Sequence, residues 1–200
     1  MKSDFKRRLV YSLNLDGSTD EVETAVKNWR FVGTSPVEPI ATVRNGILAI
    51  GTTNQTTFNC PLIDEIANCS AECELRILDD GGDPSRWAGI RLRGFLYDVR
   101  FGYTVYLRRT GSVELYRAET VIGGASTIVV PDTMNTWTRL RVDIFDDIIR
   151  VWVNGKLHID ATDRKFTDKG LVYLHTFGTQ AEFRNFAIYE VSHPLVFDPQ

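Results

Sequence analysis

Charged, tyrosine and histidine side chains alternate with apolar residues along several short segments of this chain. Arginine guanidinium groups donate paired hydrogen bonds, carboxylates accept them, and a tyrosine ring offers an apolar platform beside its hydroxyl group. Vicinal hydroxyl groups and the flat faces of sugar rings require this combination. Cross-strand Arg–Glu pairs on a solvated sheet face are the alternative explanation. The candidate ligand-binding residues are Glu74, Arg91, Arg93, Tyr106, Arg108, Glu114, Tyr116 and His175, with Trp87 as a possible platform at the rim.

The residues that could catalyse a reaction are fewer. Glycoside hydrolysis needs two carboxyl groups about 5–9.5 Å apart, and Glu72 and Glu74 would lie about 7 Å apart on one face of a strand. Arg76 beside them would keep both ionised, which disfavours an acid–base pair. The chain has neither a G-x-S-x-G nor an H-E-x-x-H motif. We therefore predict no catalytic residues, and the alternative is a glycoside hydrolase or lyase in which Glu74 and His175 converge within about 7 Å.

A metal site has one candidate segment, the loop DDGGDPSRW. Its aspartates, Asp79, Asp80 and Asp83, lie beside two glycines, and calcium prefers carboxylate and carbonyl oxygens. The spacing is not that of an EF-hand, and such clusters also occur in plain turns. We predict no cofactor, with a structural calcium ion at this loop as the alternative.

Alternation with a period of two predicts the strands that must position these side chains. Asn154-Gly155 favours a tight hairpin, because both central residues of a type I′ turn need positive φ. Short strands separated by turn signals about every ten residues indicate a sandwich or barrel. We predict one domain over residues 1–200, an all-β, two-sheet antiparallel β-sandwich. The clearest strands are expected at 71–78, 89–94, 103–108, 112–117, 138–144, 148–155, 156–160, 170–176 and 181–191.

The composition is that of an ordinary globular protein, with 43% hydrophobic and 24% charged residues among 200. A net charge of −3 gives no electrostatic reason to bind nucleic acid or an acidic membrane. No signal peptide is expected in this chain, because its first residues lack an apolar segment of about 7–15 residues. Compartment and oligomeric state stay open. We expect buried thiols at Cys69 and Cys73, with pairing of Cys60 to either one as the alternative.

Two longer stretches resemble a known superfamily. Residues 137–163, WTRLRVDIFDDIIRVWVNGKLHIDATD, resemble paired strands of concanavalin A-like (laminin-G-like) jelly rolls, in which a tryptophan opens one strand and a V-N-G turn follows the next. Residues 166–191, FTDKGLVYLHTFGTQAEFRNFAIYEV, resemble the closing strands of that superfamily. The chain is similar there to fructan-type carbohydrate-binding modules and to 3-keto-disaccharide hydrolase-like domains. The resemblance covers about residues 70–191.

The resemblance implies that the concave sheet face carries the ligand. It points to Glu74, Arg91, Arg93, Tyr106, Arg108 and His175. We therefore predict a non-catalytic carbohydrate-binding domain that grips a small polar or acidic sugar unit at the end of an oligosaccharide or polysaccharide. Arginines would donate to the sugar, Glu74 would accept, and Tyr106 would supply the apolar face. A protein-interaction or structural sandwich is a further alternative, which predicts a flat polar face and an exposed apolar patch near Trp152.

Overall fold

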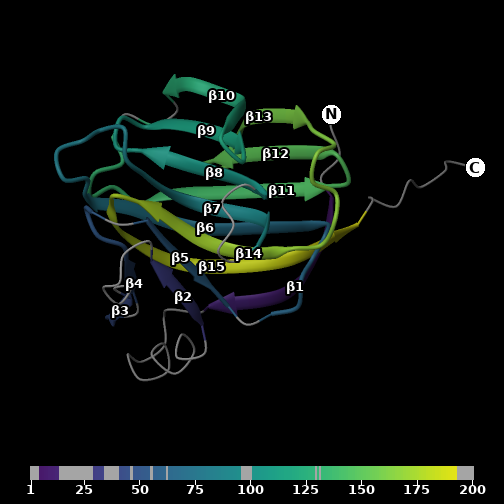
Figure 1. The fold of residues 1–200 in the computed structure, drawn as a ribbon, viewed down its shortest axis with the longest axis horizontal. Coiled ribbons are helices and arrows are strands. Elements are labelled where there is room, and N and C mark those ends of the chain that lie inside the picture. Colours follow the sequence, from purple (N-terminus) through teal and green to yellow (C-terminus); the bar gives the residue numbers. More distant parts are fainter. Residues whose placement is uncertain are drawn as a thin grey trace, which may run out of the picture.

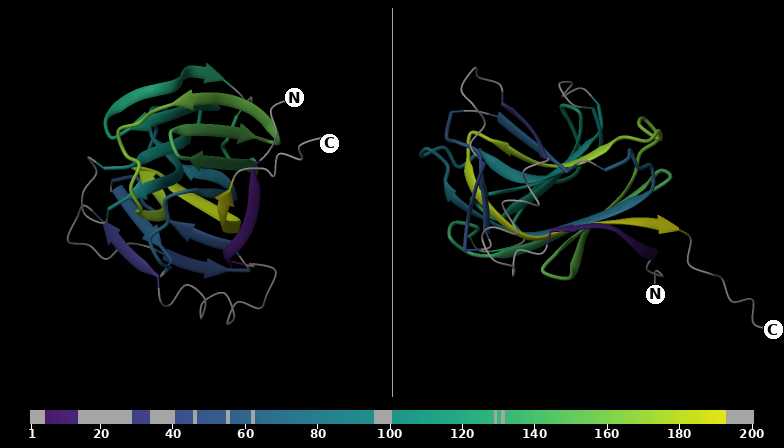
Figure 2. Two further views of the ribbon diagram at one scale, coloured as in Figure 1. Left: turned by 90° about the vertical axis from the view of Figure 1, so that its right-hand side faces the viewer. Right: turned by 90° about the horizontal axis from the view of Figure 1, so that it is seen from below.

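The computed structural model describes residues 5–13, 29–33, 41–45, 47–54, 56–61, 63–95, 101–128, 130 and 132–192. Within these ranges the regular structure is entirely β: fifteen strands form two antiparallel sheets (Figure 1). The right-hand view of Figure 2 shows the sheets as two curved layers packed face to face. The predicted all-β sandwich is confirmed. None of the described residues forms a helix of the length and apolar character that crossing a bilayer requires.

One sheet has eight strands, in the spatial order β13-β12-β11-β6-β15-β4-β3, with β1 also paired to β15. In chain order its strands are β1 (Lys6–Leu13), β3 (Ala41–Arg44), β4 (Ile47–Ile50), β6 (Cys69–Asp79), β11 (Thr138–Phe145), β12 (Ile148–Val153), β13 (Lys156–Thr162) and β15 (Gln180–Ser192). Asn154 and Gly155 join β12 to β13, and both have positive φ, 50° and 79°. The hairpin predicted from these two residues is therefore present.

The other sheet has seven strands, in the order β10-β9-β8-β7-β14-β5-β2. They are β2 (Arg30–Gly33), β5 (Thr56–Cys60), β7 (Trp87–Gly94), β8 (Tyr103–Arg108), β9 (Ser112–Arg117), β10 (Thr120–Ile128) and β14 (Leu171–Phe177). Residues before 70, which lie outside the stretch that carries the resemblance, thus contribute strands to both sheets. β14 lies between β7 and β5 and links the central strands to this N-terminal part.

The core lies between the sheets and is built by the predicted alternation. Each strand turns its apolar residues inward, because burying that face removes it from water. The fully buried residues include Ala71, Leu75 and Ile77 of β6, Ala88, Ile90 and Leu92 of β7, Val105 and Leu107 of β8, and Leu140, Val142 and Ile144 of β11.

Two of the cysteines belong to this core. Cys69 and Cys73 are buried free thiols, as predicted. Burial raises the pKa of Cys69 to about 12, so this thiol stays protonated and inert at neutral pH. The side chain of Cys60 lies outside the described part of the structure.

Candidate ligand-binding site on the seven-stranded sheet

The outer face of the seven-stranded sheet gathers polar and aromatic side chains from β7, β8, β9 and β14. Residues that face one another across antiparallel strands share a side of the sheet and lie close together. Three such rows cross these strands: Phe177–Trp87–Arg108, His175–Gly89–Tyr106–Glu114, and Tyr173–Arg91–Thr104–Tyr116. The register therefore brings together residues from positions that are up to about ninety residues apart in the sequence.

Gly89 stands at the centre of this array. A Cβ atom at this position would lie 2.0 Å from the carbonyl oxygen of Val105 and 2.6 Å from the Cα atom of Tyr106. Any other residue would push β7 and β8 apart. Glycine thus lets the rings of Trp87, Tyr106 and His175 meet, with Trp87 contacting the other two at centroid distances of 4.4 and 4.5 Å.

A cavity of about 440 Å³ opens on this face. Its volume falls within the range of about 300–1,000 Å³ that is usual for small-molecule sites. Aromatic rings and a smaller number of polar groups line it. The aromatic residues are Trp87, Tyr106, Tyr116 and Phe177, and the polar ones are Thr56, Arg91, Thr104, Glu119 and His175.

The four aromatic rings form a continuous wall. Trp87 stacks on Tyr106 at 4.4 Å and 15°, and Phe177 lies almost parallel to Trp87 at 5.9 Å and 18°. Tyr116 extends the wall, with its ring centroid 5.1 Å from that of Tyr106. Near-parallel rings at these distances support one another, and all four residues line the cavity.

Arg91 and His175 supply the buried polar groups of the cavity. Arg91 is 2% exposed, and its Nε atom donates to the carbonyl oxygen of Phe101 at 3.1 Å. Its Nη2 atom donates to the same oxygen. His175 packs its ring edge-on against Trp87. Burial, followed by the positive charge of Arg91, holds the pKa of His175 well below its usual value. The imidazole is therefore neutral at pH 7.

Tyr106 is fixed by a hydrogen-bonded network behind it. Its hydroxyl donates to Oε2 of Glu114 at 2.8 Å, and Nη2 of Arg108 donates to the same oxygen at 3.2 Å. Burial, together with hydrogen bonds to Tyr116 and Glu114, raises the pKa of Tyr106, which keeps its hydroxyl protonated. Arg108 and Glu114 were predicted to bind the ligand, but they bind each other and do not line the cavity. Their observed role is to position Tyr106.

Arg93 was also predicted to bind the ligand, and the structure places it away from the cavity. This residue has φ of 50°, which breaks the strand alternation, and its side chain is buried. The guanidinium donates to the carbonyl oxygens of Ala67, Asp146 and Phe166 at 2.6–2.8 Å. It also donates to Oδ1 of Asn68 at 3.0 Å. Arg93 thus ties together three segments of the sandwich and does not line the cavity.

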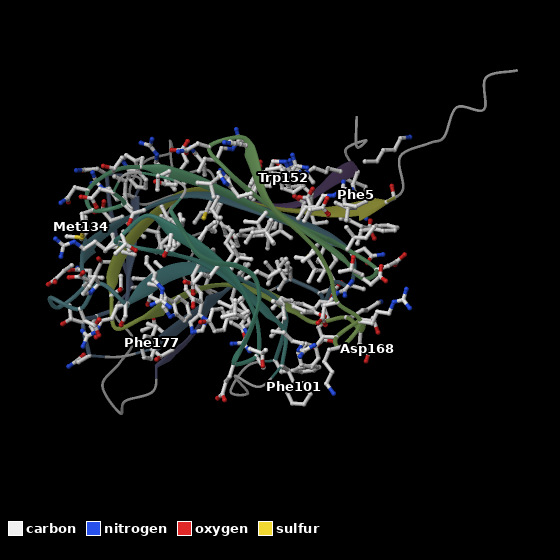
Figure 3. All side chains as sticks on the ribbon, turned by 90° about the horizontal axis from the view of Figure 1, so that it is seen from above. Phe5, Phe101, Met134, Trp152, Asp168 and Phe177 are labelled. Atoms are coloured by element: carbon white, nitrogen blue, oxygen red, sulfur yellow. The ribbon has the colours of Figure 1, made fainter. Side chains whose placement is uncertain are left out.

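Glu74 was likewise predicted to bind the ligand, and the structure places it on the other sheet. Glu74 lies on β6 of the eight-stranded sheet and pairs with Arg184, whose Nε atom is 2.5 Å from Oε2. His175 lies on β14 of the other sheet, and both side chains face outward. In Figure 3, Trp152 marks the outer face of the eight-stranded sheet and Phe177 that of the seven-stranded sheet. The two residues lie on opposite sides of the molecule. Glu74 and His175 therefore do not converge, and an acid–base pair made of these two is ruled out.

The outer face of the eight-stranded sheet carries paired arginine and glutamate side chains. Such pairs were the alternative explanation for all the candidate ligand-binding residues. Arg7 and Arg139 both pair with Glu72, and Arg76 pairs with Glu182. The guanidinium of Arg141 lies 4.3 Å from the ring centroid of Trp152. Opposite charges thus neutralise one another on this face, which contrasts with the aromatic cavity on the other side.

The aspartates of the 79–86 loop accept hydrogen bonds within the loop. Asp79 and Asp80 each accept from the backbone amide two residues on, at 2.8 and 2.9 Å. Asp80 and Asp83 also pair with Arg109 and Arg86, at 3.4 and 3.5 Å. In the described ranges no three His, Cys, Asp or Glu residues are grouped so that they could hold a metal ion. No cofactor stays the prediction, and calcium binding at this loop stays the alternative.

The structure also adds residues to the site that the sequence reasoning missed. Phe177 continues the outward alternation of Tyr173 and His175, so reading that strand one residue further would have found it. Thr104 likewise alternates with Tyr106. Thr56 and Glu119 come from β5 and from the turn after β9, and no periodic signal marks either as part of the site.

Comparison with solved structures finds similar β-sandwich folds. A carbohydrate-binding module, CBM66 from Bacillus subtilis, is 19% identical to this chain with a TM-score of 0.65. The match covers 82% of this chain and 96% of the module. A protein of unknown function with a galectin-like fold, also from Bacillus subtilis, is 13% identical with a TM-score of 0.68, covering 96% and 100%. The carbohydrate recognition domain of Emp46p is 14% identical with a TM-score of 0.63, covering 90% and 95%.

Sequence comparison gives a more specific result than these distant likenesses, which show the fold alone. Among curated proteins no sequence matches this chain. The model of one domain family does match, and it aligns with residues 16–189, which include nearly all strands of both sheets. The chain therefore belongs to the family of 3-keto-alpha-glucoside-1,2-lyase-like domains.

Proposed function

We propose that this chain binds a sugar unit, such as the end of an oligosaccharide, in the cavity on the seven-stranded sheet. The observation that carries the proposal is that the aromatic wall lies in the same cavity as the buried guanidinium of Arg91. The wall consists of Trp87, Tyr106, Tyr116 and Phe177. A sugar ring has apolar C–H faces and a rim of hydroxyl groups. The wall would cover one face, while the guanidinium of Arg91, which lines the cavity, would contact the hydroxyl groups or a carboxylate of the sugar.

The polar groups of the cavity favour binding over carboxylate-based hydrolysis. Of the described residues that line it, Glu119 alone carries a carboxyl group, whereas glycoside hydrolysis normally uses two. The names of two similar structures, a carbohydrate-binding module and a carbohydrate recognition domain, support the same proposal. The buried guanidinium of Arg91 favours a polar or acidic sugar end, because it can donate hydrogen bonds to hydroxyl groups or to a carboxylate.

A glycan array followed by calorimetry on the tightest ligand tests the proposal. Trp87→Ala is expected to weaken sugar binding at least about 30-fold, because central buried aromatic residues contribute about 2 kcal/mol or more at binding sites. Trp152→Ala is the matched control, since it makes the same change on the opposite outer face and should leave the affinity unchanged. Phe177→Ala, whose side chain is 47% exposed, tests the same wall with little risk to folding.

The proposal would have to be abandoned if the folded wild type bound no glycan on the array. It would also fail if Trp87→Ala and Phe177→Ala, both folded by circular dichroism, bound as tightly as the wild type.

The family description favours a second candidate, a lyase acting on 3-keto-α-glucosides. A ketone at C3 acidifies the proton at C2. A base that takes this proton lets its electron pair form the C1=C2 double bond while the C1–O bond breaks, and the departing oxygen then acquires a proton. His175, neutral and beside Arg91 in the cavity, has the chemistry of such a base, and Arg91 could bind the ketone oxygen.

Product analysis separates the two candidates. The protein would be incubated with 3-keto-trehalose, and release of glucose with an unsaturated keto sugar would be followed by mass spectrometry. A lyase is expected to release both, and His175→Gln should abolish their release. Unchanged 3-keto-trehalose after prolonged incubation with the wild type would remove this candidate and leave binding alone.

A further inference from the structure

A second cavity adjoins the first on the same side of the molecule. It has a volume of about 310 Å³, and Thr56 and Phe177 line both cavities. Phe177 is 47% exposed and ends strand β14, so its ring stands where the two cavities meet. Figure 3 shows Phe177 at the outer surface of the seven-stranded sheet, toward the end of the molecule that carries Met134. A ligand in the first cavity can therefore continue past Phe177 into the second.

The second cavity is built from three loops that one arginine holds together. Arg86 donates from Nη1 to the carbonyl oxygens of Thr53 and Gly178, the latter at 3.2 Å. Its Nε atom lies 3.5 Å from Oδ2 of Asp83. These residues come from the turn before β5, the loop between β6 and β7, and the turn after β14. Because Arg86 links all three, the cavity is formed before any ligand arrives.

The polar groups of the second cavity differ from those of the first. Asn54, Asp83 and Arg86 line it, and Phe177 is its single aromatic residue. Hydrogen bonds from Ser85 to the carboxylate lower the pKa of Asp83, so Asp83 is ionised at neutral pH and balances the charge of Arg86. An anionic group would meet Asp83, and a cationic group would meet Arg86. A neutral group with several hydroxyls can instead donate to Asp83 and accept from Arg86 or Asn54.

We infer that the second cavity is a subsite for the next sugar unit of an oligosaccharide, a neutral one, whose terminal unit occupies the aromatic cavity. The inference rests on the proposed function. It specifies the ligand as a disaccharide or longer and divides the roles of the two cavities: rings hold the terminal unit, and Asn54 and Asp83 hold the hydroxyls of the unit that follows.

Calorimetry with one-unit and two-unit probes tests this division. The probes are methyl α-glucoside and the α-linked disaccharides trehalose, kojibiose and maltose. At least one disaccharide is expected to bind about ten-fold more tightly than the monosaccharide, which corresponds to one or two added hydrogen bonds. Asp83→Ala and Asn54→Ala should each remove most of this gain while the affinity for methyl α-glucoside stays the same.

Asp132→Ala is the matched control. Asp132 is also an exposed aspartate that accepts a hydrogen bond from the backbone amide two residues on, that of Met134, and it lines neither cavity. If methyl α-glucoside binds in a Trp87-dependent way but no disaccharide binds more tightly, the subsite is refuted and the proposed function stands. The subsite is also refuted, and the proposed function stands, if Asp83→Ala still binds the disaccharide more tightly than methyl α-glucoside by the wild-type factor. If no probe binds, the subsite is refuted, whereas the proposed function falls only if the glycan array also shows no binding. If the probes bind but neither Trp87→Ala nor Phe177→Ala weakens binding, both fall together.

Discussion

Replacing Arg93 by methionine is expected to lower the free energy of unfolding by about 3–5 kcal/mol, the range for breaking a buried charged network. Three backbone carbonyls and one side-chain amide accept hydrogen bonds from this guanidinium. Methionine fills much of the volume but donates nothing, so each acceptor is left without its donor at a cost of about 1–3 kcal/mol. Some of this cost is recovered where water reaches the carbonyls. Urea denaturation followed by tryptophan fluorescence measures the change.

Arg8→Met is the matched control for this stability prediction. Arg8 pairs with Glu190 at 2.5 Å, but its side chain is 76% exposed, and exposed pairs contribute about 0–1 kcal/mol. The control should therefore unfold almost at the wild-type midpoint. If Arg93→Met also unfolded near the wild-type midpoint, Arg93 would not stabilise the protein as its hydrogen bonds to three segments indicate.

Arg93 also shows where reading the sequence by strand alternation fails. In GIRLRG the residues at 91 and 93 have the same period and type, and both were expected on one outer face. Only Arg91 lies there, because the chain adopts positive φ at Arg93 and sends that side chain toward carbonyls of other segments. The local sequence does not predict this conformation of Arg93, because the carbonyl groups that bind its side chain belong to the distant residues 67, 146 and 166.

Glu74 shows a second limit. Alternation assigns a residue to the outer side of its strand, but a sandwich has two outer sides, and strand order decides which one. Here β6 pairs with β11 and β15, whereas β7, β8, β9 and β14 pair with one another. Long-range pairing sets that order. The sequence predicted the fold, the hairpin at Asn154-Gly155 and the inward residues, because these depend on local periodicity and turn chemistry.

The candidate site was predicted in part for the same reason. Trp87, Arg91, Tyr106, Tyr116 and His175 all line the cavity, since each alternates outward on a strand of the same sheet. Arg108 and Glu114 also alternate outward, but their opposite charges pair with each other. Recognising this required the cross-strand register, in which Glu114 faces Tyr106.

Replacing Arg91 by lysine is expected to weaken sugar binding about 10- to 100-fold, because hydrogen bonds to charged groups contribute about 1.5–3 kcal/mol. Lysine keeps the positive charge but loses the planar fork that can bind a ligand while anchored to the carbonyl oxygen of Phe101. Arg91→Gln should lose as much affinity and also remove the charge. Calorimetry with the tightest glycan measures both variants, with thermal unfolding as the check on folding. Arg141→Lys, which changes a paired arginine on the opposite outer face, should bind like the wild type.

The imidazole of His175 provides a readout that does not depend on any ligand. The charge of Arg91 is one of two causes that lower the pKa of His175, and burial is the larger. Removing the charge in Arg91→Gln should therefore raise this pKa, though not to its ordinary value, whereas Arg91→Lys should leave it low. Proton NMR titration of the imidazole follows the shift. Both variants could instead keep wild-type affinity while the pKa moved as expected. Arg91 would then have only a structural role, which is to hold the backbone at Phe101, and the aromatic wall alone would have to bind the ligand.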